Sequence, residues 1–245
     1  MKETIIKVED LTVAYDSHPV LWDVDVSMEK GKLIAIVGPN GAGKSTLIKS
    51  MLDFKKPITG SVRFYDKPYK DIQKKISYVP QKGSVDWNFP ITVKDVVLMG
   101  RYGHLGLFKR VGKEDRKIAK EAMEKVGIYP LKDRQISELS GGQQQRVFLA
   151  RALAQKAEIY FMDEPFQGVD AKTERTIVAL FHALKKENKT LIVVHHDLET
   201  VPKYFDTVIL LKRSIIAQGP IDETFTKENI EKTYQNPFDS QEKGV

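Results

Sequence analysis

The segment from Gly38 to Thr46, "GPNGAGKST", limits the possible fold more than any other feature of this 245-residue sequence. It fits the pattern G-x-x-x-x-G-K-[S/T], and it stands between the apolar run "KLIAIVG" and a segment that we expect to be helical from Ser45 to about Asp53. Glycines let backbone N–H groups curve around an anion, and the start of a helix favours negative charge. The order of strand, glycine-rich loop and helix therefore predicts a phosphate-binding loop in an α/β sheet.

This loop predicts a nucleotide site. Lys44 is expected to reach the β- and γ-phosphates, and the Ser45 hydroxyl is expected to ligate Mg²⁺. The alternative is a glycine-rich turn that binds nothing, which the flanking strand and helix disfavour. The residues expected to bind the nucleotide here are Gly38, Pro39, Asn40, Gly41, Ala42, Gly43, Lys44, Ser45 and Thr46.

The pattern along the rest of the chain predicts strands interrupted by helices. Residues 3–37 alternate or run apolar as strands, and residues 92–127 change to a helical period. Strands return at "AEIYFMD" and "KTLIVVHHD", and "TVILL" with "SIIAQG" is expected to form a hairpin. The predicted fold class is α/β: a P-loop NTPase core, in which a mixed sheet carries an N-terminal antiparallel β part, with an inserted helical subdomain.

The predicted domains follow from this order. Residues 1–90 and 157–235 form a RecA-like nucleotide-binding core with the antiparallel β subdomain, residues 91–156 form the helical subdomain, and residues 236–245 form a flexible tail.

Composition excludes several classes of protein. The sequence has no cysteine, so disulfides and thiolate metal sites are excluded and a reducing compartment is expected. Its longest apolar runs are far too short to span a bilayer, and the N-terminus has no apolar signal region. The net charge of +6 is dispersed along the chain and is typical of an ordinary solvated surface rather than of a nucleic-acid site.

Two further segments complete the predicted chemistry. "IYFMDEP" ends a strand in Asp163, which would deliver a carboxylate to the metal, and Glu164 would polarise an attacking water. "LSGGQQQR" has the S-x-x-Q spacing of a capping box between Ser140 and Gln143. Gly141 and Gly142 cost about 1 kcal/mol each in a first helical turn, more than capping alone requires, so a second phosphate site is expected at Ser140–Gln143.

With "LSGGQ" directly ahead of "IYFMDEP", the chain resembles the nucleotide-binding subunit of an ATP-binding-cassette (ABC) transporter over nearly its whole length. In that family two subunits dimerise head to tail, and ATP lies between the P-loop of one and the LSGGQ motif of the other. The resemblance implies Mg²⁺-dependent ATP hydrolysis, with ATP and Mg²⁺ as cofactors and Glu164 as general base.

The resemblance also carries over single residues. Tyr15 matches the aromatic that stacks on adenine, with burial in the core as the alternative. Gln81 matches the glutamine that senses the γ-phosphate and, together with Ser45 and Asp163, holds Mg²⁺. Asp170 matches the acidic residue that links the two sites across the dimer. His196 matches the switch histidine at the γ-phosphate. His195 stands where many members of the family have Ser or Thr, and is expected to be structural. Because neighbouring strand residues point to opposite faces, the two histidines are not expected to bind one ion together. The scattered histidines do not predict a protein metal cage.

The implied partners are a second copy of the chain, two integral-membrane permease subunits and, indirectly, an extracellular or periplasmic metal-binding receptor, with no nucleic acid. The implied location is the cytoplasmic face of a bacterial or archaeal plasma membrane. The stretches "SVDWNFPITVKDVVLMGRYGHLGLFKR" and "DEPFQGVDAKTE" resemble the ATPases of manganese, zinc and iron importers. An importer for another small nutrient, such as an iron chelate, and a soluble ABC ATPase that acts on nucleic acid are the alternatives.

The loop "PQKGSVDWNFP" carries aromatic residues outside any apolar period. By the same resemblance, Gln81 acts at the nucleotide and the segment of Asp86, Trp87, Asn88 and Phe89 docks on the permease. The alternative is that Trp87 and Phe89 are buried under the helical insertion.

Overall fold

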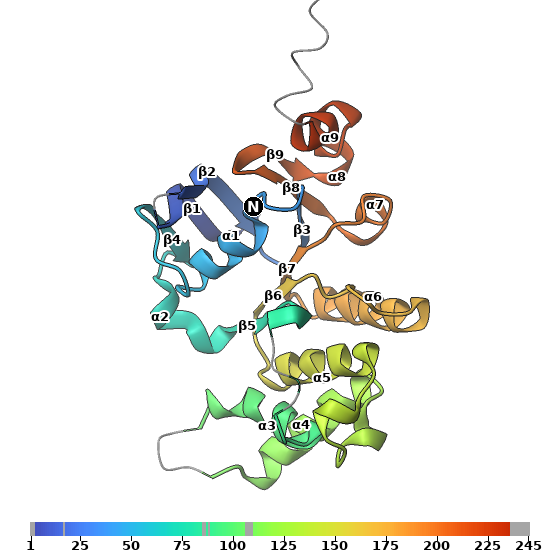
Figure 1. The fold of residues 1–245 in the computed structure, drawn as a ribbon. Coiled ribbons are helices and arrows are strands. Elements are labelled where there is room, and N and C mark those ends of the chain that lie inside the picture. The colour runs from blue at the N-terminus through green and yellow to red at the C-terminus, as the bar shows by residue number, and fades with distance from the viewer. Residues whose placement is uncertain (1–2, 17, 85–86, 88, 106–109, 236–245) are drawn as a thin grey trace, which may run out of the picture. The chain divides into compact units, whose positions relative to one another are not determined.

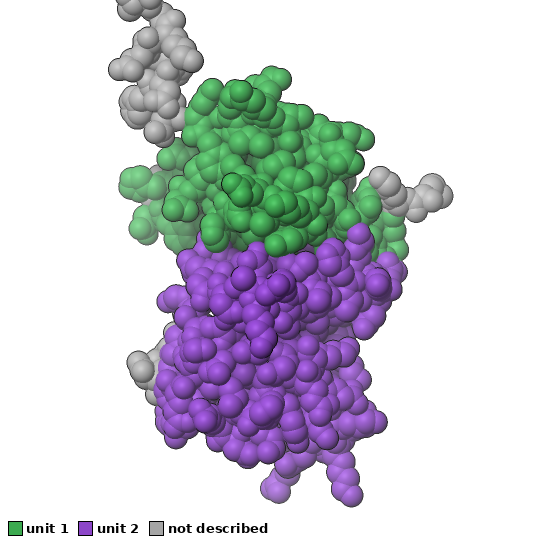
Figure 2. All heavy atoms as spheres, turned by 90° about the vertical axis from the view of Figure 1, so that its right-hand side faces the viewer, with its two compact units in different colours: residues 1–71, 193–245 green, residues 72–192 purple. Residues whose placement is uncertain are grey.

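The structure is a computed structural model that describes residues 3–16, 18–84, 87, 89–105 and 110–235. The chain divides into two compact units, residues 1–71 with 193–245 and residues 72–192, which Figure 2 colours separately. The division predicted from the sequence, with a core at 1–90 and 157–235 and a helical subdomain at 91–156, stays a prediction, and the predicted tail at 236–245 lies outside the described residues.

Unit 1, residues 1–71 and 193–245, contains an antiparallel sheet of β1 (Thr4–Tyr15), β2 (His18–Glu29) and β4 (Thr59–Phe64), in the order β2-β1-β4 (Figure 1). In β2 the buried positions alternate with exposed ones from Val24 to Met28, because successive side chains point to opposite faces of a sheet. The antiparallel β part predicted for the N-terminal region is confirmed.

The same unit contains strands of a second, mixed sheet. The strand β3 (Leu33–Val37) pairs in parallel with β8 (Thr207–Lys212), and β8 pairs antiparallel with β9 (Ser214–Pro220), so the predicted hairpin is confirmed. All residues of β3 are buried, which explains its continuous apolar run. The helices of this unit are α1 (Lys44–Met51), α7 (Val201–Tyr204), α8 (Ile221–Thr224) and α9 (Lys227–Tyr234).

Unit 2, residues 72–192, contains β5 (Ile76–Val79) and β6 (Ile159–Asp163), which pair in parallel. The helix α6 (Ala171–Lys186) leads from β6 to β7 (Thr190–Val194). Two elements, α2 (Tyr69–Ile72) and β7, span the boundary between the units. Short 3₁₀ turns occur at Gln73–Lys75, Lys82–Ser84, Tyr129–Leu131 and Ile136–Glu138.

The predicted helices of unit 2 are α3 (Val93–Tyr102), α4 (Lys113–Lys125) and α5 (Gly141–Ala154). A part-buried ion pair joins two of these helices, since Arg101 Nε on α3 donates to Asp115 Oδ1 on α4 at 3.0 Å. The same guanidinium donates through Nη1 to the carbonyl of Ala154 on α5 at 2.8 Å. The predicted stop at Gly127 is confirmed, because this glycine has a φ of 67° directly after the last turn of α4.

Together these elements confirm the predicted class, α/β with a mixed sheet, an antiparallel β part and a run of helices. Across the described ranges, every helix is too short or too polar to cross a bilayer.

Candidate functional site

The phosphate-binding loop of unit 1 depends on close backbone approach at Gly38. A Cβ atom at this position would collide with the backbone carbonyl oxygen of Leu211 on β8. The turn after β8 also contacts the loop, because Arg213 N–H donates to the Ala42 carbonyl at 2.9 Å. The loop therefore lies against the backbone of β8, and only glycine fits at position 38.

Lys44 lies at the start of α1 with its ammonium group above the loop. The side chain is buried, and its Nζ donates to the carbonyls of Gly38 and Pro39, each at 2.8 Å. Gly43 precedes the helix in a left-handed conformation with a φ of 98°, and α1 has no acidic residue in its first turn. A buried cation and the positive end of a helix dipole thus lie together, which favours an anion such as a phosphate chain.

Tyr15 ends β1 and is 41% exposed, so it does not belong to the hydrophobic core. The ammonium of Lys55 lies 4.4 Å from the centre of its ring. This exposure contradicts the alternative of a buried strand aromatic. An exposed aromatic ring is compatible with stacking on a base.

The adjacent histidines differ in their surroundings. The sequence argument treated His195 and His196 as neighbouring strand residues. This premise was wrong, because β7 ends at Val194. His195 is nevertheless buried, with its Nε2 at 2.7 Å from Thr200 Oγ1 and its ring against Phe205, and burial lowers the pKa of His195 to about 4. His196 is exposed. His195 is therefore a core side chain, and only His196 is open to a ligand.

In unit 2 a pair of carboxylates follows the end of β6. Asp163 is buried at 2% exposure, and together with burial its charge raises the pKa of Tyr78 to about 12. Glu164 has a φ of 52°, a left-handed conformation that is uncommon for a residue with a side chain. Its Oε2 accepts a hydrogen bond from Gln81 Nε2 at 2.9 Å. The structure thus joins two predicted catalytic residues that are 83 positions apart in the sequence.

The LSGGQ motif caps α5 as its spacing predicts. Ser140 N–H donates to Gln143 Oε1 at 2.9 Å, and Gln143 N–H donates to Ser140 Oγ at 3.4 Å. The two glycines also have packing roles, since a Cβ at Gly141 would collide with Lys82 Nζ and one at Gly142 would lie 3.3 Å from Thr173 Oγ1. Like α1, α5 has no acidic residue in its first turn.

Asp170 is the N-cap of α6. It accepts a hydrogen bond from Thr173 N–H at 2.8 Å and another from Thr173 Oγ1 at 3.1 Å. These donors hold the pKa of Asp170 below its usual range. A Cβ added at Gly142 would lie 3.6 Å from Asp170 Oδ2, so the structure brings this predicted residue close to the LSGGQ helix.

Trp87 and Phe89 differ in their environment. The ring of Trp87 packs edge-on against Phe148 of α5, with centroids 5.0 Å apart, while Phe89 is 59% exposed. The alternative of a packed side chain therefore holds for Trp87, and Phe89 remains free to dock a partner. Asp86 and Asn88, the other two residues predicted to dock, lie outside the described residues.

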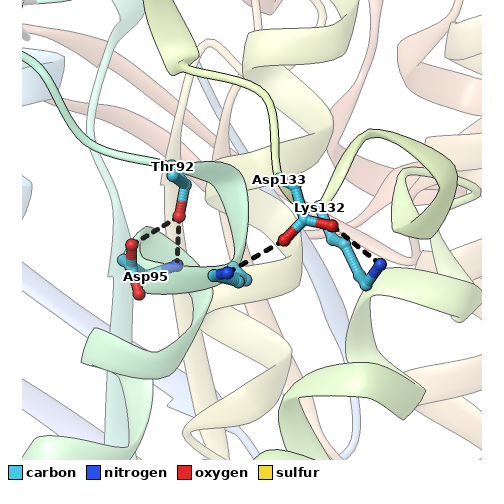
Figure 3. A network of polar contacts seen from close by, with 5 residues as sticks. Thr92, Asp95, Lys132 and Asp133 are labelled. Atoms are coloured by element: carbon cyan, nitrogen blue, oxygen red, sulfur yellow. Dashed lines mark hydrogen bonds and ion pairs between the residues drawn. The ribbon is translucent and has the colours of Figure 1, made fainter.

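The start of α3 is held by a network of polar side chains, shown in Figure 3. Thr92 caps the helix and bonds Asp95, while Asp133 accepts hydrogen bonds from Lys94 at 2.9 Å and from Lys132 at 2.8 Å. These donors lower the pKa of Asp133 to about 2, with the Lys132 contact as the larger cause. The network fixes where the loop that carries Phe89 enters the helix.

Comparison with known proteins decides the family. The family model described as "ABC transporter" matches residues 21–167, which include the P-loop, the LSGGQ motif and the Asp163–Glu164 pair. The chain belongs to the ABC transporter family.

Its similar relatives are ATP-binding proteins of metal transport systems. The chain is 57% identical over 229 residues to the manganese transport system ATP-binding protein MntB of Bacillus subtilis, covering 94% of this chain and 92% of that protein. It is 56% identical over 229 residues to the zinc transport system ATP-binding protein TroB of Treponema pallidum, covering 94% and 86%.

A similar solved structure is a dimeric ATP-binding cassette in a post-hydrolysis state, bound to ADP and Pi. It has a TM-score of 0.76 and 28% identity, with coverage of 89% of this chain and 99% of that chain. The ABC family assignment and the P-loop fold expected from the sequence are thus confirmed. Membership of this family implies a nucleotide site and ATP hydrolysis coupled to transport.

Sequence reasoning missed three residues that contact the site in unit 2: Lys82, Phe148 and Thr173. Lys82 directly follows Gln81, and Thr173 stands three positions after Asp170, the spacing of an N-cap and its donor. These spacings are visible in the sequence. Phe148 lies in an apolar helix, and its contact with Trp87 has no local signal.

Proposed function

We propose that this chain is the ATP-hydrolysing subunit of an ABC importer for a divalent metal ion, with manganese and zinc as the favoured substrates. The metal assignment rests on the relatives, since two of them at 56% and 57% identity are named for zinc and manganese transport. The ATPase assignment rests on the site itself.

The loop residues fit a phosphate chain. The backbone of the loop requires glycine at Gly38 and Gly43, where a Cβ would collide with Leu211 and Leu21, and Lys44 supplies a buried positive charge beside the first turn of α1. The donor set for the metal is one hydroxyl, one carboxylate and one amide oxygen, from Ser45, Asp163 and Gln81, and oxygen ligands of this kind suit Mg²⁺. A bound Mg²⁺ would neutralise charge on the β- and γ-phosphates.

The observation that carries the ATPase proposal is the hydrogen bond of 2.9 Å between Gln81 Nε2 and Glu164 Oε2. It orients the carboxylate of Glu164, which we assign as the general base that takes a proton from the attacking water. His196, which is exposed after β7, is assigned to the γ-phosphate, and Tyr15 is assigned to the adenine base. The protein's contribution is positioning and charge stabilisation.

Two copies of the chain are proposed to form a head-to-tail dimer in which Ser140–Gln143 of one copy completes the phosphate site of the other, with Asp170 linking the two. The dimeric cassette bound to ADP and Pi supports this assembly. Two permease subunits and an external metal-binding receptor complete the importer, and the chain acts at the cytoplasmic face of the membrane.

The test is metal content and uptake in a strain that lacks the gene. Deletion is expected to lower cellular manganese or zinc by elemental analysis, and to abolish uptake of the same radioactive metal. Wild-type chain should restore both. Glu164→Gln should restore neither, while Glu121→Gln, an exposed carboxylate on α4, should restore both and serves as the matched control.

Unchanged manganese and zinc with loss of an iron chelate or another nutrient would overturn the metal assignment but keep the transport role. Loss of no nutrient, together with defects in DNA or RNA metabolism, would favour the soluble nucleic-acid ATPase instead.

A further inference from the structure

Gln81 belongs to a short segment that is tied to α5. Its side chain bonds Glu164, and the next residue, Lys82, offers its backbone carbonyl to the indole Nε1–H of Trp87 at 3.0 Å. The indole is therefore hydrogen-bonded to the residue that directly follows Gln81, the residue that orients the proposed base. A movement of Trp87 would displace the backbone next to Gln81.

The ring of Trp87 is in turn fixed on α5. It packs edge-on against Phe148 with centroids 5.0 Å apart, and Phe148 is almost fully buried. The guanidinium of Arg151 lies 4.6 Å from the centre of the Phe148 ring and donates from Nη2 to the carbonyl of Tyr78 on β5 at 3.2 Å. The surface that receives Trp87 is thus itself bound to the strand that leads into Gln81.

A second contact lies two helical turns earlier on α5. Lys82 Nζ lies so close to Gly141 that a side chain at position 141 would collide with it. Lys82 and Trp87 therefore contact α5 at its first turn and at its middle. Within the described part of the chain, Lys82 forms no ion pair that would compete for this placement.

We propose that Trp87 is a positioning residue for catalysis, which holds the Gln81 amide against Glu164 because its indole, packed on Phe148, fixes the backbone of Lys82. This inference rests on the proposed ATPase function. Trp87 acts in this role through the backbone of Lys82, whose carbonyl accepts the indole N–H. It couples the LSGGQ helix to the proposed base of the same chain.

The alternative is that Trp87 contributes packing to α5 and nothing to catalysis. The two roles separate in a double-mutant cycle between Trp87 and Gln81, measured as steady-state ATPase of the full-length chain. If Trp87 acts through Gln81, its loss has little further effect once Gln81 has been replaced.

The expected results are a fall of about tenfold in kcat for Trp87→Ala with KM for ATP changed less than about twofold, because the P-loop contacts are intact. Gln81→Ala with Trp87→Ala should hydrolyse ATP at about the rate of Gln81→Ala alone. Trp87→Phe keeps an aromatic ring for Phe148 but loses the Nε1–H, and should fall by roughly threefold. Trp22→Phe, at a tryptophan that is 60% exposed, is the matched control and should match the wild type.

If the losses of kcat in Gln81→Ala and Trp87→Ala multiply in the double variant, the two residues act independently and the proposal is overturned. A wild-type kcat in Trp87→Ala with an unchanged melting temperature would also overturn it. If Trp87→Ala does not fold, the cycle is run with Trp87→Phe, and the same two outcomes decide. Failure of the underlying function gives a different pattern, in which the wild-type chain hydrolyses no ATP or Gln81→Ala leaves the rate unchanged.

Discussion

The P-loop of unit 1 and the segment from Gln81 to Phe89 of unit 2 are stabilised by different parts of the chain. The P-loop lies on backbone: Gly38 packs against the carbonyl of Leu211, and Ala42 accepts a hydrogen bond from Arg213 N–H. The second segment is held largely by side chains, through Gln81 on Glu164 and Trp87 on Phe148. The P-loop tolerates no added atom at Gly38, whereas the segment from Gln81 to Phe89 depends on the side chains that it carries.

This difference has a consequence for motion. Backbone contacts to a buried strand give the phosphate site one geometry, as binding of a phosphate chain requires. Contacts made by long side chains can be replaced by other contacts at a lower cost in free energy than backbone contacts. The Gln81 segment is therefore suited to change its position when α5 moves or a partner binds. Phe89, which is 59% exposed at the end of this segment, is the residue that we expect to contact the permease.

The largest contrast is expected from adding one methyl group to each region. Gly38→Ala should reduce ATP affinity at least about 100-fold and the free energy of unfolding by roughly 3 kcal/mol, because the backbone carbonyl of Leu211 cannot move aside. Gly83→Ala should change neither, since a Cβ there meets no atom within 4 Å. Nucleotide titration and urea denaturation measure both effects. Equal changes of ATP affinity and unfolding free energy in Gly38→Ala and Gly83→Ala would contradict the difference between the two regions.

Next in size is Ser140→Arg at the start of α5. A bulky cation there should block closure of the nucleotide dimer and lower ATPase by about 100-fold, while the isolated chain keeps its ATP affinity within about twofold. Loss of the cap costs about 1 kcal/mol of stability in addition. Ser137→Arg, on an exposed turn three residues earlier, is the control. A large loss of ATP affinity in Ser140→Arg would contradict the proposal that the P-loop and the LSGGQ motif of one chain bind different nucleotides of the dimer.

The third effect concerns the dependence of stability on pH and the core behind the P-loop. Burial holds His195 neutral with a pKa of about 4, whereas in the unfolded chain it titrates near 6.5. The unfolded state therefore binds more protons between these values, so the free energy of unfolding should fall by roughly 3 kcal/mol as pH drops from 6.5 to 4. The groups near this imidazole are His196, Asp197 and Tyr204.

Urea denaturation at several pH values measures this dependence. His195→Thr should flatten the profile in that range relative to the wild type, while His182→Gln, at an exposed position of α6, should keep the wild-type slope. An unchanged slope in His195→Thr would show that His195 does not titrate as a buried group.

Local signals were sufficient to predict most of the fold. The apolar run of β3, the alternation of β1 and β2 and the glycine after α4 each specify local structure, and their predictions are confirmed. The helices α7, α8 and α9 were not assigned from the sequence. Two of them, α7 and α8, have four residues each, too few to show a helical period, so packing rather than periodicity determines them.

The site was predictable where a motif carries its own geometry. The capping box of Ser140 and Gln143 and the contact of Lys44 with Gly38 belong to this class, because both join residues close in sequence. The bond between Gln81 and Glu164 and the packing of Trp87 on Phe148 join residues more than sixty positions apart. No periodicity or spacing predicts such pairs, and the roles of the predicted site residues remain proposals.

The assignment of Glu164 as general base for ATP hydrolysis is the central claim, and single-turnover hydrolysis of Mg-ATP tests it most directly. Glu164→Gln keeps the size of the side chain and its hydrogen-bonding reach to Gln81 but cannot take up a proton. The account predicts that this variant binds ATP as tightly as the wild type, accumulates as a dimer, and hydrolyses ATP at least about 100-fold more slowly. A wild-type hydrolysis rate in Glu164→Gln would contradict it.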